Sequence, residues 1–285
     1  MDVVLETAKK LSDASLRKLY NPFDRVDYDD MLDDTKFHFS EEYISIFHEP
    51  EYVTLTFDEK KRLSLLEMVN YFSINIYGEQ SLIQEFEKRL YRDGSICEGF
   101  AASQYLQKFI HEENSHTFML AEYCHRYHGS LFRNKTIDTT RGELSFEATE
   151  LLMYGRTLLL ERFLAYFNKL IMHDDRVDRT TRACNRAHLL DEVRHIEWDR
   201  TVIGHYMSVL REKGNDAEIE SIKSALAVYL DTAFKMLHNP KVYKLMDFDN
   251  NLELAKRSLL NPRRAAQISE WRKYVESELS KHSLY

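Results

Sequence analysis

The chain has 285 residues and a formal net charge of −8, with acidic and basic residues well mixed along it. A surface that binds phosphate backbones needs a basic excess, so this charge argues against a general nucleic-acid-binding protein. With only 8 glycines and 4 prolines, the sequence offers little turn chemistry for a hairpin-rich fold. The composition therefore predicts an all-α protein with a substantial core.

The N-terminal sequence MDVVLETAKKLSDASLRKLY lacks a cationic stretch followed by a long apolar core, and no segment approaches about 18 uncharged apolar residues. We therefore expect a soluble, cytoplasmic protein without a membrane span. The cysteines are odd in number and form no CxxC pair, which favours reduced structural thiols over a disulfide framework or a thiolate zinc site. They are Cys97, Cys124 and Cys184.

Residues 1–55 are expected to form a short helix followed by an arm that packs on the main body. The pattern changes at Thr56, where TFDE fits a capping box with Thr56 as the cap and Glu59 three residues later. This signal predicts the start of a long helix, which the sequence RDGS at 92–95 is expected to end.

Four long helical runs are predicted in all, and at about 1.5 Å per residue each is about 40 to 55 Å long. Their lengths favour a four-helix bundle over 56–213, within a single domain that includes the whole chain, 1–285. The polar sequence GSLFRNKTIDTTRGE connects the second run to the third, and two or three shorter helices, interrupted near Pro240 and Pro262, are expected over 214–285. The four runs span about 58–91, 100–127, 145–172 and 176–213.

The segment HLLDEVRH in the fourth run places His188, Glu192 and His195 at spacings of four and three. On an α-helix, offsets of four and seven return to within roughly 40° of the starting direction, so the three side chains share one face. Two imidazoles and a carboxylate on one face form half of a metal site if the face points inward. They form an ordinary polar stripe if it points at water.

Two ExxH pairs indicate the inward alternative. Glu113 with His116 lies on the second run, and Glu192 with His195 lies on the fourth. Helical bundles use this arrangement to hold two metal ions, with one further carboxylate from each remaining helix. The first and third runs offer Glu79 in YFSINIYGEQSLI and Glu161 in YGRTLLLERFLAYF, where a glutamate among apolar neighbours is costly to bury unless it binds a cation or is protonated.

Other residues compete for these roles. Glu112 is an alternative to Glu113, although it breaks the match with the second ExxH pair, and Glu147 and Glu150 compete with Glu161 but fall in a polar first turn, where we expect them to be solvated. The histidine pair near the end of the second run is expected to have no functional role. Three tyrosines near the proposed site in sequence are expected to pack in the core rather than contact substrate. The histidines are His125 and His128, and the tyrosines are Tyr77, Tyr123 and Tyr154.

With these residues in place, the chain resembles the ferritin-like di-iron carboxylate superfamily and, most closely within it, the p-aminobenzoate N-oxygenase (AurF-like) family. The resemblance covers about 56–213. That family adds a histidine four residues before the second ExxH pair, and His188 matches it; a buried histidine bonded to a neighbouring carboxylate remains the structural alternative. The metal and catalytic residues that the resemblance implies are Glu79, Glu113, His116, Glu161, His188, Glu192 and His195.

The resemblance implies two iron ions, or manganese, with O2 as co-substrate, and N-oxygenation of an amine substrate through a peroxo-di-iron intermediate. It also implies an external electron donor, a reductase or reduced carrier, since the sequence contains no flavin or nicotinamide fingerprint. We expect a small-molecule substrate and no nucleic acid or membrane partner. A homodimer is one oligomeric state that the chain could adopt. Acyl carrier protein desaturases also resemble the chain around EEN and DEVRH but lack the histidine at His188. A di-iron desaturase or oxidase acting on carbon is therefore the first alternative, and an iron-binding or ferroxidase protein is the second.

Overall fold

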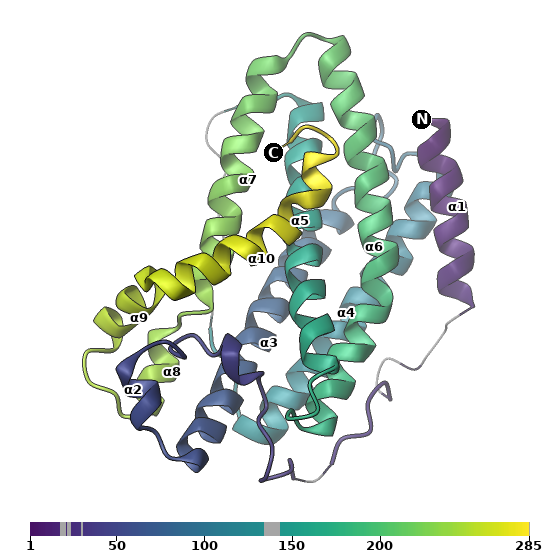
Figure 1. Cartoon of the computed structure of the whole chain (residues 1–285). Helices are drawn as coiled ribbons and strands as arrows, with labels where there is room; N and C mark the ends of the chain where they lie inside the picture. Colours follow the sequence, from purple (N-terminus) through teal and green to yellow (C-terminus); the bar gives the residue numbers. More distant parts are fainter. Residues whose placement is uncertain (18–20, 22–23, 30, 134–142, 285) are drawn as a thin grey trace.

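The structure is a computed structural model and describes residues 1–17, 21, 24–29, 31–133 and 143–284. Over these residues the chain is helical, which confirms the predicted all-α class, and the extended pairing is limited to an isolated bridge between Phe37 and Val177. Four long helices lie side by side and form the centre of the molecule (Figure 1). They are α3 (Phe57–Glu87), α4 (Phe100–His128), α5 (Phe146–Met172) and α6 (Arg179–Glu212).

Side-chain caps explain where the long helices begin. The predicted capping box is present at α3, where the Glu59 N–H donates to the Thr56 hydroxyl at 3.3 Å and the Thr56 N–H donates to the Glu59 carboxylate at 2.8 Å. Ser145 caps α5 and Asp178 caps α6 in the same way, by accepting from backbone N–H groups of the first turn. At the other end of α4, Gly129 adopts the left-handed conformation, with φ of 86°, that closes a helix.

The predicted end of the first long helix was wrong, because α3 stops at Glu87, before RDGS. Beyond it the chain turns so that the Arg89 side chain meets Glu150 on α5, with Nη2 and Oε1 2.9 Å apart in a buried ion pair. Sequence periodicity cannot anticipate a helix end that is set by a partner about sixty residues away.

The bundle has one long connection. The end of α3 lies beside the starts of both α4 and α5, because the Tyr91 N–H donates to Ser103 and Arg89 pairs with Glu150. Consequently α4 and α5 run in the same direction, whereas the other consecutive long helices are antiparallel. Ferritin-like bundles share this single crossover. Most of the predicted polar connection between α4 and α5, residues 134–142, lies outside the described residues.

Further helices pack around the bundle. Helix α1 (Asp2–Leu16) lies on α4 and α6, and α7 (Asp216–Met236) lies on α5. The prediction of two or three short helices after 214 was wrong, because four are present there and α7 has 21 residues. Pro240 and Pro262 occupy the first helical position of two of them, where proline starts a helix rather than interrupting one. The others are α8 (Pro240–Leu245), α9 (Asn251–Leu260) and α10 (Pro262–Ser280), and the arm holds η1 (Glu41–Tyr43) and α2 (Pro50–Thr54).

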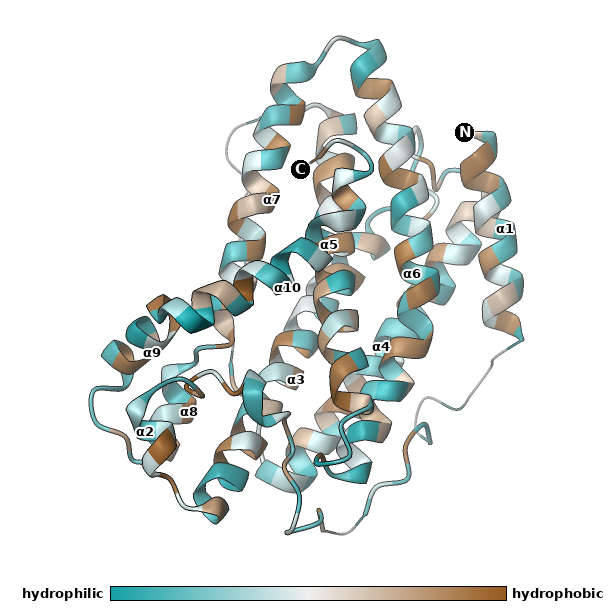
Figure 2. Cartoon of the chain, viewed as in Figure 1, coloured by the Kyte–Doolittle hydropathy of each residue, from teal (hydrophilic) through white to brown (hydrophobic). Residues whose placement is uncertain are grey.

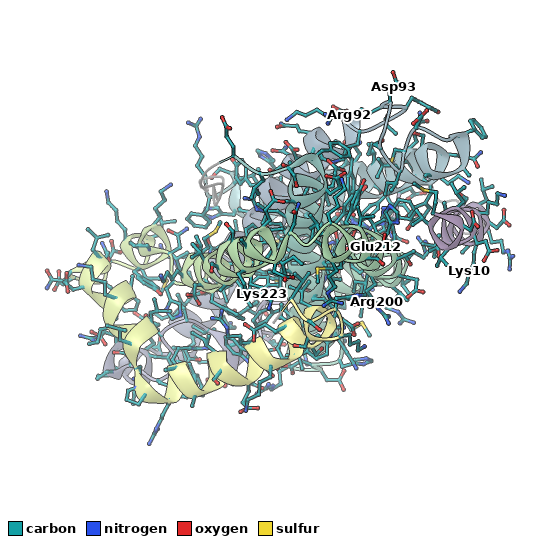
Figure 3. All side chains as sticks on the ribbon, turned by 90° about the horizontal axis from the view of Figure 1, so that it is seen from above. Lys10, Arg92, Asp93, Arg200, Glu212 and Lys223 are labelled. Atoms are coloured by element: carbon teal, nitrogen blue, oxygen red, sulfur yellow. The ribbon has the colours of Figure 1, made fainter. Side chains whose placement is uncertain are left out.

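The core lies where these helices face one another, and it extends without interruption from α1 to the C-terminal helices. Hydrophobic and hydrophilic residues form stripes on the outer helices (Figure 2). Seen from above, charged side chains such as Lys10 and Asp93 project at the rim (Figure 3). None of the described helices is both long and apolar enough to span a membrane. Whether residues 1–285 behave as one folding unit stays a prediction.

Candidate metal centre

The structure brings together, inside the bundle, all seven residues that the sequence singles out. Each of the four long helices contributes at least one of them, and every one is at most 1% exposed. Their ligand atoms form two groups within which all atoms lie within 4.8 Å of one another. One group contains Glu79, His116 and His188; the other contains Glu113, Glu161, Glu192 and His195.

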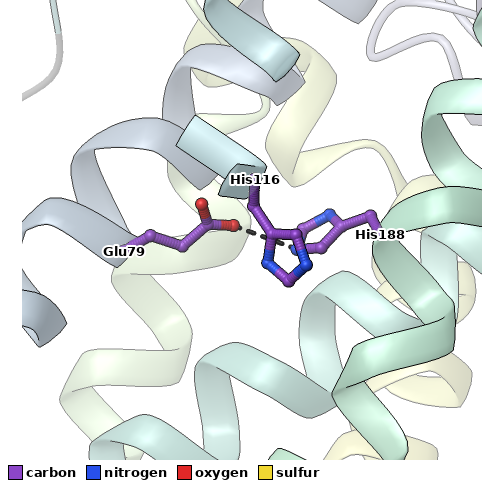
Figure 4. A group of neighbouring side chains, drawn as sticks. All are labelled: Glu79, His116 and His188. Carbon is purple, nitrogen blue, oxygen red and sulfur yellow. Dashed lines mark ion pairs between the residues drawn. The ribbon is translucent and has the colours of Figure 1, made fainter. Parts of the chain in front are cut away.

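The first group joins three helices (Figure 4). The His188 Nε2 atom on α6 lies 3.0 Å from Glu79 Oε1 on α3 and 2.7 Å from Glu192 Oε1. His116 on α4 points its Nδ1 atom inward, 3.6 Å from Glu192 Oε1. Two donors that bind a common ion at about 2.1 Å and at right angles lie about 3 Å apart, so these separations suit a shared cation.

The second group is centred on His195, whose Nδ1 atom lies 2.8 Å from Glu113 Oε1, 3.4 Å from Glu192 Oε2 and 3.7 Å from Glu161 Oε2. Glu113 and Glu192 also reach the first group through their other oxygen atoms, Oε2 and Oε1 respectively, each 3.6 Å from His116 Nδ1. Each of these two glutamates therefore directs one oxygen atom at each group. A carboxylate that bridges two cations needs this arrangement.

The inward-facing atoms of the cluster approach one another but have no hydrogen-bond partner outside it. They include both oxygens of Glu79, Glu113, Glu161 and Glu192, together with His116 Nδ1, His188 Nε2 and His195 Nδ1. Buried polar atoms are nearly always satisfied, so a set of buried acceptors facing one another indicates that cations complete it. Carboxylate oxygen and imidazole nitrogen are donors suited to iron or manganese.

The pKa values show strong electrostatic coupling within the cluster. Burial and the negative charge of Glu113 raise the pKa of Glu79 well above its usual range. Burial opposes charge on His116, but Glu113, Asp191 and Glu192 outweigh it and raise the pKa of that imidazole to about 10. Burial and the nearby His116 hold the pKa of His188 well below its usual value, so His188 is a neutral imidazole. Neutral imidazole is the form that binds metal.

Two carboxylates that the sequence reasoning did not assign lie directly behind the histidines. The His195 Nε2 atom lies 2.9 Å from Glu112 Oε2, and the His116 Nε2 atom lies 3.1 Å from Asp191 Oδ2. An outer carboxylate of this kind fixes the orientation of the ring and leaves Nδ1 facing the centre. Glu112 thus supports a histidine rather than replacing Glu113. The sequence held a signal for both, because each immediately precedes an ExxH glutamate.

Buried arginines hold these outer carboxylates in place. Arg194 donates through Nη2 to Glu112 at 2.7 Å and to Asp191 at 2.5 Å. Arg25, from the N-terminal arm, donates to the other Asp191 oxygen at 2.7 Å and to the Ala187 carbonyl at 2.8 Å. The arm therefore contacts the outer shell of the cluster, a connection between residues far apart in sequence that no motif indicated.

Some of the competing residues lie where the sequence predicted and others do not. His125 is exposed and His128 is half-buried, both away from the cluster. Glu147 is half-buried, but Glu150 is buried against Arg89, so the expectation that it would be solvated was wrong. An arginine outside its own helix satisfies it. Tyr123, Tyr154 and the three cysteines are buried in the core, whereas Tyr77 is half-buried and lines a pocket.

Comparison with known proteins places the chain in a family. The family described as P-aminobenzoate N-oxygenase AurF matches residues 3–280. No curated protein matches the chain significantly. A solved R2-like ligand-binding oxidase with aerobically reconstituted Mn/Fe cofactor has 18% identity and a TM-score of 0.51, and the match covers 96% of this chain and 91% of that one. A variant of such an oxidase with anaerobically reconstituted Mn/Fe cofactor has 17% identity and a TM-score of 0.54, covering 96% and 91%.

At this identity the solved structures show the fold alone, and they agree with a ferritin-like helical bundle. The family match shows more than the fold, because it extends over nearly the whole chain and includes the residues of the buried carboxylate and histidine cluster. The chain belongs to the p-aminobenzoate N-oxygenase AurF family and, with it, to the oxidoreductases of the di-iron oxygenase and oxidase class.

Proposed function

We propose that the chain is an O2-dependent oxygenase that oxidises the nitrogen of an amine at a centre of two iron ions. The seven clustered residues are the metal ligands in this proposal, with Glu79, His116 and His188 on one side and Glu161 and His195 on the other. The observation that carries it is the orientation of Glu113 and Glu192, whose two oxygen atoms are directed at different groups. The Mn/Fe cofactors of the structural neighbours support manganese as an occupant of one position.

When bound, the metal pair supplies the electrons and the O2 affinity that reaction with an amine requires. The chain supplies position and exclusion of water. Glu112 and Asp191 hold the inner histidine rings in one orientation, and the nearly complete burial of all seven residues keeps bulk water out. Formation of a hydroxylamine from an amine and O2 consumes two electrons and two protons and releases one water, so a separate reductase or reduced carrier must act with this chain.

In this proposal the substrate approaches along a pocket that lies between α3, α5 and α7. Mainly apolar side chains line it, with Tyr77, Tyr229 and Phe163 as aromatic members. Gly78 and Leu160 also line it, and each directly precedes a proposed metal ligand, Glu79 or Glu161. The pocket therefore lies on the α3 and α5 side of the centre.

The walls of the pocket favour an amine carried on an apolar or aromatic body. Arg156 and Glu85 supply the charged groups among the lining residues, and Ser81 and Thr157 supply hydroxyls. An uncharged amine avoids the desolvation cost that an ammonium ion would meet among such walls. The family description names an aromatic amine, which agrees with this environment.

The apolar walls also favour a second candidate, oxidation or desaturation of a carbon on an acyl substrate. The experiment that separates the two uses iron-loaded protein, reduced without oxygen and then mixed with isotopically heavy O2. Aromatic amines such as p-aminobenzoate are compared with acyl thioesters. Heavy oxygen on the amine nitrogen, detected by mass spectrometry, supports N-oxygenation. Oxidised acyl product with unchanged amines supports the second candidate, and consumption of O2 without either product indicates an iron oxidase.

A further inference from the structure

Behind His188 lies a buried polar pair that no ligand motif predicts. The Asn168 Nδ2 atom on α5 lies 3.0 Å from His188 Nδ1, and the Tyr71 hydroxyl on α3 donates to Asn168 Oδ1 at 2.9 Å and to the Leu164 carbonyl at 3.0 Å. Asn168, Tyr71 and His188 are all completely buried. Water therefore cannot supply a hydrogen bond that these three side chains do not make with one another.

This arrangement contains two mismatches for a metal-binding His188. An imidazole that binds metal through Nε2 carries its proton on Nδ1, yet the Asn168 NH2 group, also a donor, faces that nitrogen. In addition, the Tyr71 hydroxyl has one proton and two acceptors within bonding distance.

Turning the Asn168 amide by half a revolution removes both mismatches at once. The amide oxygen then accepts from His188 Nδ1–H, and the amide NH2 donates to the Tyr71 oxygen, while Tyr71 keeps its donation to the Leu164 carbonyl. The two amide orientations differ only in the exchange of oxygen and nitrogen, so the same atomic positions accommodate both. Every hydrogen bond from His188 to the Leu164 carbonyl then has one donor and one acceptor.

We infer that Asn168, oriented by Tyr71, is a positioning residue that selects the His188 tautomer able to bind metal. This inference rests on the proposed metal centre. It adds an uncharged amide to the groups that hold the histidine rings in place. The other two histidines have carboxylates behind Nε2, whereas His188 has an amide behind Nδ1. Metal uptake at the His188 side is coupled to the amide orientation, because only one orientation leaves Nε2 without a proton.

Two substitutions of Asn168 test the inference, because only one of them should change the metal affinity. In Asn168→Asp the carboxylate still accepts from Nδ1–H, so the variant should keep wild-type affinity for both metal ions. In Asn168→Leu the acceptor is lost, and affinity for one of the two ions should fall by about 10 to 100-fold. Tyr71→Phe should give a smaller loss of the same ion, because the amide is then free to turn. Asn70→Leu is the matched control, since Asn70 is equally buried on α3 but bonds to Met236 and Asn239.

The measurements are anaerobic Fe²⁺ titration of the full chain and nitrogen NMR of the histidine rings in protein loaded with Zn²⁺, a diamagnetic probe. Far-UV circular dichroism checks folding. We expect a His188 ring protonated at Nδ1 in loaded wild-type and Asn168→Asp protein. Equal Fe²⁺ affinity of Asn168→Leu and Asn70→Leu, or a His188 ring protonated at Nε2, would overturn the inference. If His188→Ala also leaves both ions bound, the proposed metal centre itself fails; if that variant loses an ion and Asn168→Leu does not, only the role of Asn168 fails.

Discussion

At the scale of single residues, two pairs of adjacent acidic residues contact different groups, because consecutive side chains on a helix point about 100° apart. Glu113 faces the cluster while Glu112 reaches the far side of His195, and Glu192 faces the cluster while Asp191 reaches the far side of His116. Each doublet therefore supplies an inner carboxylate and a support for the histidine of the opposite helix. The two ExxH pairs are thereby locked to each other.

The first prediction concerns His188, which belongs to the first metal group. In His188→Ala we expect one metal ion to bind about 10 to 100-fold more weakly, because the site loses its nitrogen donor beside Glu79. Metal analysis and the absorption spectrum of oxygenated protein measure this, with circular dichroism to confirm folding. If His188 is only a core histidine, the variant instead loses roughly 1 to 3 kcal/mol of stability with unchanged metal content.

The second prediction concerns Glu112. Glu112→Leu should weaken the ion beside His195 by about 10 to 100-fold, because the ring loses the carboxylate that fixes its orientation. Titration with Fe²⁺ measures the loss. Glu122→Leu is the control, since Glu122 lies on the same helix but at the surface, paired with Arg126. Equal Fe²⁺ affinities of the two variants would show that Glu112 has a purely structural role.

At the scale of secondary structure, the four long helices were predictable because three of them carry a side-chain cap at their start and all four have a continuous inward face. Thr56, Ser145 and Asp178 lie before their helices as caps, and Gly129 follows α4. The spacing of Glu113, His116, Glu192 and His195 likewise placed them on shared faces. Features that depend on distant partners were not predictable: the early end of α3, the burial of Glu150 and the approach of Arg25 to Asp191.

The third prediction tests α7 as a wall of the substrate pocket. Ala233→Phe places a ring among the pocket-lining residues and should reduce turnover of amine or acyl substrates at least 10-fold, while Fe²⁺ content stays unchanged. Val228→Phe places the same ring on an exposed position of the same helix and should leave turnover near wild type. Product formation is measured by mass spectrometry. Equal turnover in both variants would mean that substrate enters elsewhere.

The fourth prediction concerns Glu67 on α3, which contacts Ser45 of the arm inside the protein. Burial, only partly offset by Ser45 and Arg264, raises the pKa of Glu67 to about 7 from 4.5. Between these values the folded state binds more protons than the unfolded state, so stability falls as pH rises through this window. The contribution is about 3 kcal/mol, since one unit of pKa corresponds to about 1.4 kcal/mol.

Glu67→Gln removes the titration and keeps an acceptor for Ser45. We expect the difference in unfolding free energy between variant and wild type to shift in favour of the variant by about 3 kcal/mol from pH 4 to pH 8. Urea denaturation at several pH values measures it. Parallel curves for the two proteins would show that Glu67 stays charged in the folded state, paired with Arg264.

At the scale of the whole molecule, segments outside the bundle hold it together around the centre. Tyr243 of α8 lies 2.7 Å from the Ser45 hydroxyl, and Arg264 of α10 donates to the Ile44 carbonyl, so the C-terminal helices contact the arm. The Arg25 side chain, also from the arm, donates to Asp191, which lies behind His116 of the cluster. Changes in occupancy of the centre are therefore expected to affect the stability of the entire chain.

The fifth prediction follows from that coupling. Without cations, four buried carboxylates face one another with unpartnered oxygens, an arrangement that burial disfavours. An ion that binds only the folded state stabilises it by about 2.7 kcal/mol at a concentration of 100 times its Kd. For a chain of this size each such ion should raise the Tm by roughly 4 to 5 °C. Calorimetry of chelator-treated protein, with and without anaerobic Fe²⁺, measures the shift. Glu113→Ala, which lacks a bridging ligand, should lose most of it, and a Tm indifferent to Fe²⁺ in the wild-type chain would contradict a metal centre at these residues.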